Sequence, residues 1–465
     1  MGLNCNIFLF LYLPIIAVIY YILQNLKTGE KAGKIWLIVN SLFIYGGFGY
    51  INLIYLLILF LFNYITGSLI LKYEKRYSDF WFISGIAINI VAWLIIKYTL
   101  PLLTVYNYVF KTYYHTQEWM IPVGYGIIII QQIFYLIECK KKLIKQNNII
   151  DYLTFSTFFP KLIAGPLISY TDFTSQFTKD SLKVNYKNIA SALFVIFYCL
   201  FLKVVFADTF SNIVKNGFDS QSLNFVQAWV VALCNTFNIF FDIYAYSGMA
   251  AGIALLFNIK LPDNFNSPFK AQNIKDFWQR WHITFTSFFI NNIAKPLTRK
   301  RKNIFTCSIA LLFTFVIMGI WHKMNIQFVL WGLLNALAII AFLMFKNLKI
   351  PKIIRFIFMF VFLNFTWLLF TANGLSQALT VAEGMLSIKS IFIYYNEFYI
   401  LWPIKANFII VILLIVSWFI ARKIKNTKNI IESFKPSLLN LCLLVLFIAI
   451  SLLFNKENPF IYYGF

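Results

Sequence analysis

Long apolar runs, most of them close to the length that crosses a bilayer, restrict the fold of this 465-residue chain more than any other feature. A transmembrane helix needs about 20 apolar residues, and only helices and closed barrels satisfy their backbone polar groups in lipid. The runs lie near residues 7–24, 35–48, 50–71, 80–100, 118–137, 188–206, 226–258, 303–321, 326–345, 353–371, 407–421 and 438–454. We therefore predict an all-α polytopic integral membrane protein with about eleven transmembrane helices.

The composition agrees with this class. Hydrophobic residues make up 60% of the chain and charged residues only 12%, whereas soluble chains carry about 25% charged residues. Soluble nucleic-acid-binding proteins, secreted scaffolds and disordered tails are excluded. The first run, 7–24, has neither a basic segment before it nor a small-residue cleavage site after it, so it predicts a retained helix.

The net charge of +23 needs a separate explanation. Part of it reflects a composition rich in Lys, Ile, Asn and Phe. The rest is typical of cytoplasmic loops, where Lys and Arg collect, so we expect membrane lipids and not nucleic acid beside them. The basic clusters are Lys140, Lys141, Lys142 and Lys145; Lys295, Arg299, Lys300, Arg301 and Lys302; and Arg422, Lys423, Lys425 and Lys428.

Two segments interrupt the pattern of simple apolar hairpins. Residues 151–173 are apolar but contain Pro160, Gly165 and Pro166, and residues 262–299 alternate polar and aromatic side chains. Irregular backbone at membrane depth is tolerated where it is buried in protein or lines a wet cavity. We predict re-entrant or interfacial helices around a central tunnel. Because no linker or internal repeat is visible, residues 1–465 form one predicted domain.

His322 is the first candidate for chemistry. It ends an apolar run and precedes Lys323 and a further span, about 28 Å from the basic residues at the run's other end. An imidazole there can take a proton from a hydroxyl and return it later. The alternative is an interfacial histidine with a hydrogen-bonded ring.

A second candidate group surrounds His282 in the segment FWQRWH. Trp278, Trp281 and Phe285 share one helical face, while Arg280 and His282 point elsewhere. This pattern fits either an aromatic tunnel wall with polar anchors or an aromatic belt at the membrane interface. Upstream, Asn264 and Asn266 lie in a turn-rich stretch.

Other sites of chemistry are less evident in the sequence. Asp242, inside a long apolar run, is expected to be a structural partner of Arg280 or Lys270, or to orient a histidine. The six Cys and three His lack metal-ligand spacing, so no metal is expected. No hydrolase, P-loop or dinucleotide motif appears.

Together these segments resemble the membrane-bound O-acyltransferase family, and most closely its bacterial alginate and peptidoglycan O-acetylation branch. The similar segments are IPVGYGIIIIQQIFYLIE, FFPKLIAGPLISY, GIALLFNIKLPDNFNSPFKAQNIKDFWQRWHITFTSFF, MGIWH, FVLWGLLNAL and the chain end PFIYYGF. They place a central signature region at about 118–345 and an aromatic tail at 459–465.

The resemblance implies an acyl group carried through a protein tunnel to a hydroxyl acceptor. It implies catalytic roles for His322 and His282. The residues expected along the tunnel or against substrate are Asn264, Asn266, Trp278, Arg280, Trp281 and Trp321. Tyr462 is implied as an acyl carrier; Tyr463 is the alternative carrier, and an interface anchor is the alternative role.

The sequence also departs from the family pattern at several positions. Gly248 stands where an acidic residue is usual, Lys323 where a glycine follows the histidine, and Asn335 where a further histidine is usual. In the block after His282, Asn291 and Asn292 fall in a segment that normally reads Arg-Asp-Tyr. Because both histidines are present, we expect the chemical core to be intact and the acceptor contacts to differ.

The resulting hypothesis is a multi-pass enzyme of the bacterial cytoplasmic (inner) membrane. It would take acetyl from cytoplasmic acetyl-CoA and pass it, through an extracytoplasmic O-acetyltransferase partner protein, to a cell-envelope polysaccharide, peptidoglycan first. An alginate-like exopolysaccharide and teichoic acid are alternative acceptors. Competing classes are a flippase for lipid-linked substrates, which performs no covalent chemistry, and a structural scaffold.

Overall fold

The computed structural model describes residues 2–26, 28–113, 122–178, 183–299, 303–393 and 404–461. Over these ranges the regular structure is helical and contains no strand, as predicted. The first elements are η1 (Phe8–Tyr12), α1 (Leu13–Gln24), α2 (Gly29–Gly46), α3 (Tyr50–Lys72), α4 (Lys75–Phe110), α5 (Tyr125–Lys140), α6 (Ile149–Thr157), α7 (Phe159–Leu162), α8 (Tyr170–Thr174), α9 (Tyr186–Leu202), η2 (Lys203–Ala207) and α10 (Asp208–Phe218).

The second part of the chain begins with the longest buried helix and ends with a short apolar helix. Its elements are α11 (Phe225–Leu256), η3 (Pro268–Lys270), α12 (Ile274–Arg280), α13 (Ile283–Phe289), η4 (Ile290–Ala294), α14 (Lys295–Thr298), α15 (Ile304–His322), α16 (Ile326–Met344), α17 (Lys352–Thr371), α18 (Leu375–Leu386), α19 (Ser390–Ile393), α20 (Ile404–Lys423), α21 (Thr427–Ser433) and α22 (Leu438–Phe454).

Seven helical stretches of the described chain are long and apolar enough to cross a membrane. They are α3, α4 as far as Thr99, the α9 to α10 stretch, α11, α15, α16 and α17. Phe8–Gln24 and Leu438–Phe454 are apolar but shorter. The multi-pass class is therefore supported, whereas the predicted number of about eleven spans is not confirmed.

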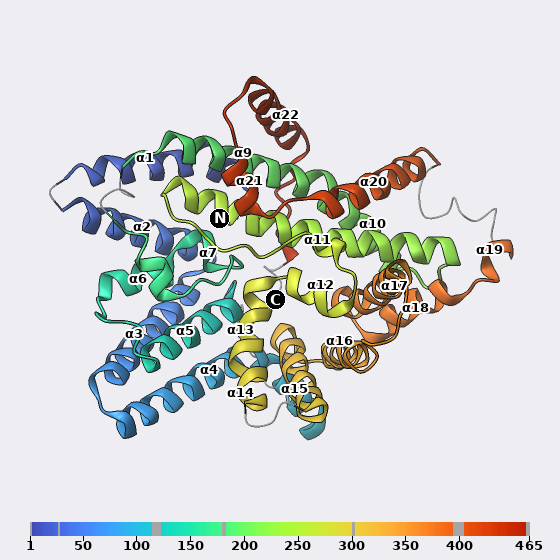
Figure 1. The fold of residues 1–465 in the computed structure, drawn as a ribbon, viewed down its shortest axis with the longest axis horizontal. Helices are drawn as coiled ribbons and strands as arrows, with labels where there is room; N and C mark the ends of the chain where they lie inside the picture. The colour runs from blue at the N-terminus through green and yellow to red at the C-terminus, as the bar shows by residue number, and fades with distance from the viewer. Residues whose placement is uncertain are drawn as a thin grey trace.

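Helix α11 forms the centre of the molecule and crosses the middle of Figure 1, with α9 on one side and α12 on the other. Its most apolar stretch is entirely buried. Gly248 and Gly252 repeat at the four-residue spacing that lets two helices approach closely. A Cβ at Gly248 would lie 2.3 Å from Cys199 Sγ on α9. The glycine that stands here, where an acidic residue is usual in the family, therefore allows α11 to pack tightly on α9.

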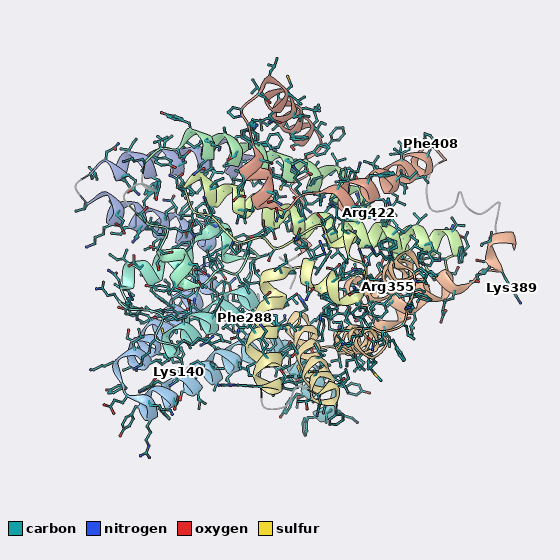
Figure 2. All side chains as sticks on the ribbon, viewed as in Figure 1. Lys140, Phe288, Arg355, Lys389, Phe408 and Arg422 are labelled. Carbon is teal, nitrogen blue, oxygen red and sulfur yellow. The ribbon has the colours of Figure 1, made fainter. Side chains whose placement is uncertain are left out.

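The two interrupted segments are broken into short helices, as predicted. Residues 151–173 form most of α6, then α7 and the start of α8. Residues 154–168 within this segment are buried throughout. Residues 262–299 form η3, α12, α13, η4 and α14. Side chains fill the space between these elements, including Phe288 on α13 (Figure 2), whose ring lies 5.8 Å from that of Phe134 on α5.

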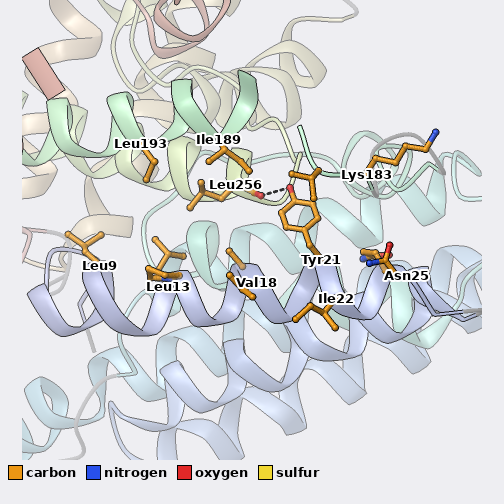
Figure 3. A pocket seen from close by; sticks show the side chains of 14 residues that line it. Leu9, Leu13, Val18, Tyr21, Ile22, Asn25, Lys183, Ile189, Leu193 and Leu256 are labelled. Carbon is orange, nitrogen blue, oxygen red and sulfur yellow. Dashed lines mark hydrogen bonds between the residues drawn. The ribbon is translucent and has the colours of Figure 1, made fainter. Parts of the chain in front are cut away.

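The outer surface is also largely apolar, as expected for helices that face lipid. Phe408 on α20, for example, is 71% exposed and points outward in Figure 2. A mostly apolar groove of about 970 Å³ lies between α1 and α9 (Figure 3), with Leu13 and Leu193 on opposite walls. None of the predicted site residues lines this groove.

Helices α15 and α16 form the hairpin that presents His322. Each begins at an asparagine whose side chain accepts a backbone N–H: Asn303 from Thr306 at 2.8 Å, and Asn325 from Phe328 at 3.1 Å. The hairpin closes tightly because a Cβ at Gly319 would lie only 2.1 Å from the Phe328 carbonyl oxygen. That atom is backbone, so a larger residue must push the helices apart.

Gly319→Ala is therefore expected to lower the stability of the purified protein by about 1–3 kcal/mol, the usual effect of overpacking. Thermal unfolding in detergent, followed by loss of the monodisperse chromatographic peak, measures this. Gly46→Ala is the matched control, because its Cβ would meet only Leu53 Cδ2 at 3.5 Å. Equal melting of both variants and the parent would contradict close packing of α15 on α16.

Candidate active site

His282 occupies a sharp turn between α12 and α13. Its backbone is left-handed, with φ 44° and ψ 52°, a conformation uncommon outside glycine and frequent at functional sites. Asn264 holds the following residues: its carbonyl oxygen accepts the Ile283 N–H at 2.8 Å, and its side-chain oxygen accepts the Thr284 hydroxyl at 2.5 Å. Its amide donates to the Ser247 hydroxyl at 3.1 Å. The turn, and with it the imidazole, is thereby fixed against α11.

His322 is the last residue of α15, where backbone carbonyls have no partner within the helix. Helix α4 supplies those partners. Lys97 Nζ donates to the carbonyl oxygens of Trp321 at 2.8 Å and His322 at 2.5 Å, and the Tyr98 hydroxyl donates to the Ile320 carbonyl at 2.8 Å. A cation at a helix C-terminus also stabilises the helix dipole. These bonds hold the backbone of His322 in place.

The two histidines, 40 residues apart in sequence, line one small buried cavity. The Phe285 ring contacts both imidazoles, with ring centroids 5.0 Å from His282 and 5.4 Å from His322. The side chains of His282 and His322 are 4% and 7% exposed. The cavity holds about 10 Å³, roughly the space of one water molecule. A reacting group must therefore displace side chains to enter.

Aromatic side chains form most of the cavity wall. Trp278 of α12 and Trp281, the residue after that helix, lie beside Trp331 of α16 and Trp367 of α17, with the Trp281 and Trp367 rings 4.9 Å apart. The Trp278 indole N–H donates to the side-chain oxygen of Asn335 at 3.1 Å. Asn335, one of the departures from the family pattern, thus orients a tryptophan of the wall.

The predicted tunnel residues do not all line this cavity. Trp278 and Trp281 do, and Trp321 lines a neighbouring cavity of about 20 Å³ together with His322. Asn264 and Asn266 line neither, and nor does Arg280, whose guanidinium pairs with Asp276 at 2.7 Å. Their expected contact with substrate stays a prediction, while their observed bonds support the turn at His282.

Burial determines the charge of His282. Because the ring is enclosed by apolar side chains, its pKa falls to about 4. The imidazole is therefore neutral near pH 7 and acts as a hydrogen-bonding group. Within the described ranges, no three His, Cys, Asp or Glu side chains gather in a way that would hold a metal ion.

Two larger cavities flank the histidines. One, of about 740 Å³, reaches Thr284, two residues from His282, and its charged lining residues are Lys141, Lys187, Lys260, Lys428, Asp172, Asp263 and Glu432. It brings together members of two predicted cytoplasmic clusters. The other, of about 330 Å³, contains Lys323 and shares Phe370 with the histidine cavity. It lies at the end of α15 opposite Arg299. The first cavity approaches His282 through Ile283 and Thr284, and the second adjoins the histidine cavity at Phe370.

The aromatic tail reaches the second flanking cavity. Ile461, its last described residue, lines that cavity. Tyr462 and Tyr463, the predicted acyl carrier and its alternative, lie outside the described residues. The prediction for Asp242 is wrong in its partner: its carboxylate pairs with Lys203 at 2.7 Å and accepts the Ile461 N–H at 2.8 Å. Arg280 is instead satisfied by Asp276 one helical turn away.

Sequence reasoning missed several residues of the site. Lys97 lies inside an apolar run, and an ionisable residue there is a functional candidate by default. The same rule applies to Lys203. Nothing in the sequence around Trp331 and Trp367 pointed to the site, because a tryptophan in an apolar helix is usually a core or interface residue. Only the crossing of α16 and α17 brings them to His322.

Comparison with known proteins identifies the family of the chain. The family model described as MBOAT, membrane-bound O-acyltransferase family, matches residues 41–376. A peptidoglycan O-acetyltransferase of Helicobacter pylori is 31% identical, over 99% of this chain and 97% of its own. The probable alginate O-acetylase AlgI of Pseudomonas aeruginosa is 26% identical over 83% and 75%. A teichoic acid D-alanyltransferase of Bacillus subtilis is 26% identical over 48% and 60%.

Proposed function

The chain belongs to the membrane-bound O-acyltransferase family, and we propose that it transfers acetyl from acetyl-CoA to a cell-envelope polysaccharide, with peptidoglycan as the first candidate. One observation carries the proposal: two buried histidines share a cavity, a larger cavity that contains four lysines reaches the residues after His282, and another cavity adjoins at Phe370. A donor and an acceptor can thus approach the same imidazoles from opposite sides of the membrane.

The chemistry assigned to His322 is general base catalysis. Its imidazole takes the proton of an acceptor hydroxyl while the hydroxyl oxygen attacks the thioester carbonyl carbon. The carbon–sulfur bond then breaks, and the imidazolium returns the proton to the leaving thiolate, so that CoA departs as a thiol. His282, neutral at pH 7, donates or accepts a hydrogen bond that positions the thioester. The aromatic wall excludes water, which would otherwise hydrolyse the donor.

The cavity of about 740 Å³ is the proposed donor vestibule. Its volume falls in the range of small-molecule sites. Lys141 and Lys260 bring ammonium groups suited to the phosphates of CoA, and Thr284 leads toward His282. The basic cluster that begins at Arg299 is an alternative site for these phosphates; Lys300, Arg301 and Lys302 lie outside the described residues, and Arg299 does not line the vestibule.

The acceptor proposal rests on the relatives. The Helicobacter pylori protein, similar along almost the whole chain, is named for acetylation of peptidoglycan. An alginate-like polysaccharide is the second candidate, because proteins named for alginate acetylation match 83% of the chain. In either case the acetyl group leaves on the side of Lys323, where we propose that an extracytoplasmic O-acetyltransferase partner receives it.

A reconstituted half-reaction tests the proposal. Full-length protein in liposomes is incubated with acetyl-CoA labelled in the acetyl group, and free CoA and protein-bound label are measured. Acetyl-dependent release of CoA with transfer of label is expected. If the donor stays intact while a lipid-linked saccharide crosses the bilayer, the protein is a flippase. If neither occurs with any acceptor, the scaffold interpretation replaces the proposal.

Replacing two lysines of the vestibule by glutamine tests the donor site. The double variant K141Q/K260Q is expected to raise the KM for acetyl-CoA about tenfold with little change in kcat, because it removes binding shared by ground and transition states. The parent enzyme's KM should also rise with salt, and less so in the variant. Lys145→Gln is the control, since Lys145 belongs to the same basic cluster but does not line the vestibule. An unchanged KM in K141Q/K260Q would remove the donor from this cavity.

A further inference from the structure

A buried group of charges lies apart from the histidine cavity. Lys203 Nζ contacts Asp208 Oδ1 and Asp242 Oδ1, each at 2.7 Å. The three side chains are 4%, 11% and 1% exposed. None of them lines the cavity between His282 and His322. Buried charges persist when they are paired and their remaining hydrogen-bonding groups are satisfied, so the further partners of this group indicate its role.

Those further partners belong to the tail that follows α22. Asp242 Oδ2 accepts the Ile461 N–H at 2.8 Å. Lys203 Nζ lies 3.5 Å from the Pro459 carbonyl oxygen and 5.0 Å from the centre of the Phe460 ring. Three consecutive tail residues thus contact the same ion pair. Hydrogen bonds to ionised groups are the stronger ones, and cation–π contacts strengthen on desolvation.

Contacts with the beginning of the chain guide the tail toward this ion pair. Asn455 donates to the Asn4 carbonyl at 2.8 Å, and Asn4 donates to the Asn458 carbonyl at 2.8 Å. The tail then passes inward from exposed Glu457 to Phe460, which is 2% exposed and packs edge-on against Tyr246. Because residues 455–460 form no helix or strand, these side-chain contacts determine where the tail lies.

The direction of the tail gives the ion pair a role in the reaction. Ile461 lines the cavity that also contains Phe328 and Phe370. The rings of those two residues lie 6.1 Å and 5.1 Å from the His322 ring. The next residue along the chain is only one peptide unit, about 3.8 Å between Cα atoms, beyond Ile461. The anchor point of residues 459–461 therefore controls the reach of a following side chain toward His322.

We infer that Lys203 and Asp242 are positioning residues that bind residues 459–461 and so position the tail for acetyl transfer at His322. These contacts of Lys203 and Asp242 with residues 459–461 are called the grip below. The inference rests on the proposed function for its catalytic part, whereas the grip itself is a structural property. Asp208 satisfies the remaining side of the Lys203 ammonium. Neither Lys203 nor Asp242 is required to touch the donor.

The test separates the grip from a general effect on folding. A buried ion pair is often replaced by apolar residues of similar size without loss of stability, so K203M/D242L, made together with D208N so that no buried carboxylate is left without its cation, removes the grip in a variant expected to fold. The control is K34M/D151L, which removes another Lys–Asp contact, 2.6 Å long, that touches no tail residue. Asp242→Asn keeps an oxygen for the Ile461 amide and should give an intermediate result.

Two measurements on full-length protein in detergent test whether the ion pair holds the tail and whether this matters for acetyl transfer. Hydrogen exchange of the C-terminal peptide is expected to accelerate about tenfold or more in K203M/D208N/D242L and not in K34M/D151L. Acetyl transfer to acceptor should fall by a similar factor, with the KM for acetyl-CoA unchanged. Exchange and transfer equal to the parent would overturn the inference.

The two proposals can fail separately. If the parent transfers no acetyl but its tail loosens only in K203M/D208N/D242L, the grip stands and the proposed function fails. If the parent transfers acetyl and K203M/D208N/D242L releases the tail without loss of transfer, the grip has no catalytic role and the inference is overturned.

Discussion

His322→Ala is expected to reduce acetyl transfer by about 10²–10⁴-fold, the usual effect of removing a general base. His322 lines both the cavity that it shares with His282 and the neighbouring cavity beside Trp321, and its ring lies 5.1 Å from that of Phe370, which lines the cavity reached by the tail. Lys97 binds the backbone carbonyl of this residue, and this bond does not depend on the ring that the substitution removes. The loss should appear in kcat more than in the KM for acetyl-CoA.

Envelope O-acetylation in cells and CoA release by purified protein measure the effect, at matched protein levels. Met318→Ala is the matched control, because Met318 lines the same cavity and carries no proton-transferring group. It should reduce transfer far less. Full acetylation with His322→Ala would rule out the general-base role and would favour the flippase or scaffold classes.

Replacing His282 distinguishes a positioning role from a general-base role in the same cavity. A neutral positioning group loses less on replacement than a base, so His282→Ala should raise the KM for the thioester and lower kcat by a smaller factor than His322→Ala. Its left-handed turn depends on Asn264. The hydrogen bonds of Asn264 give one structural reason for an asparagine beside this histidine, and its contact with substrate stays a prediction.

Much of the fold followed from local patterns. The apolar runs near 226–258, 303–321 and 326–345 coincide with α11, α15 and α16, because length and hydropathy are properties of consecutive residues. The proline and glycine positions in 151–173 predicted broken helices for the same reason. The number of spans was harder to predict, because α5 has only 16 residues and is interior although it is apolar.

The site was only partly predictable, because its contacts join distant segments. Both histidines were candidates from the sequence, but Lys203 and Asp242 lie in separate apolar runs with nothing to show that they pair. Asp242 was predicted to pair with Arg280 or Lys270, or to orient a histidine, and not to pair with Lys203. The crossing of α9 and α11, fixed by Gly248 and Gly252, instead brings Lys203 within 2.7 Å.

Tyr462→Phe is expected to abolish both the acetyl adduct on the C-terminal peptide and envelope O-acetylation. The change removes one hydroxyl and keeps the ring, so an interface anchor would survive it while an acyl carrier would not. Ile461, its neighbour, is held by Asp242 in the cavity beside Phe328 and Phe370. An acetyl ester formed on the tyrosine oxygen would pass its acetyl to a hydroxyl of the extracytoplasmic partner.

Mass spectrometry of the C-terminal peptide, after incubation with labelled acetyl-CoA, identifies the carrier. Tyr463→Phe is the matched control: it has the same chemistry one residue further on and should keep the label. Label that moves with Tyr463 would transfer the role to that residue. Label absent from the whole tail, with acetylation of the envelope intact, would mean that acetyl passes from CoA to its acceptor directly at His322, and the tail would then act only as an anchored plug of the far cavity.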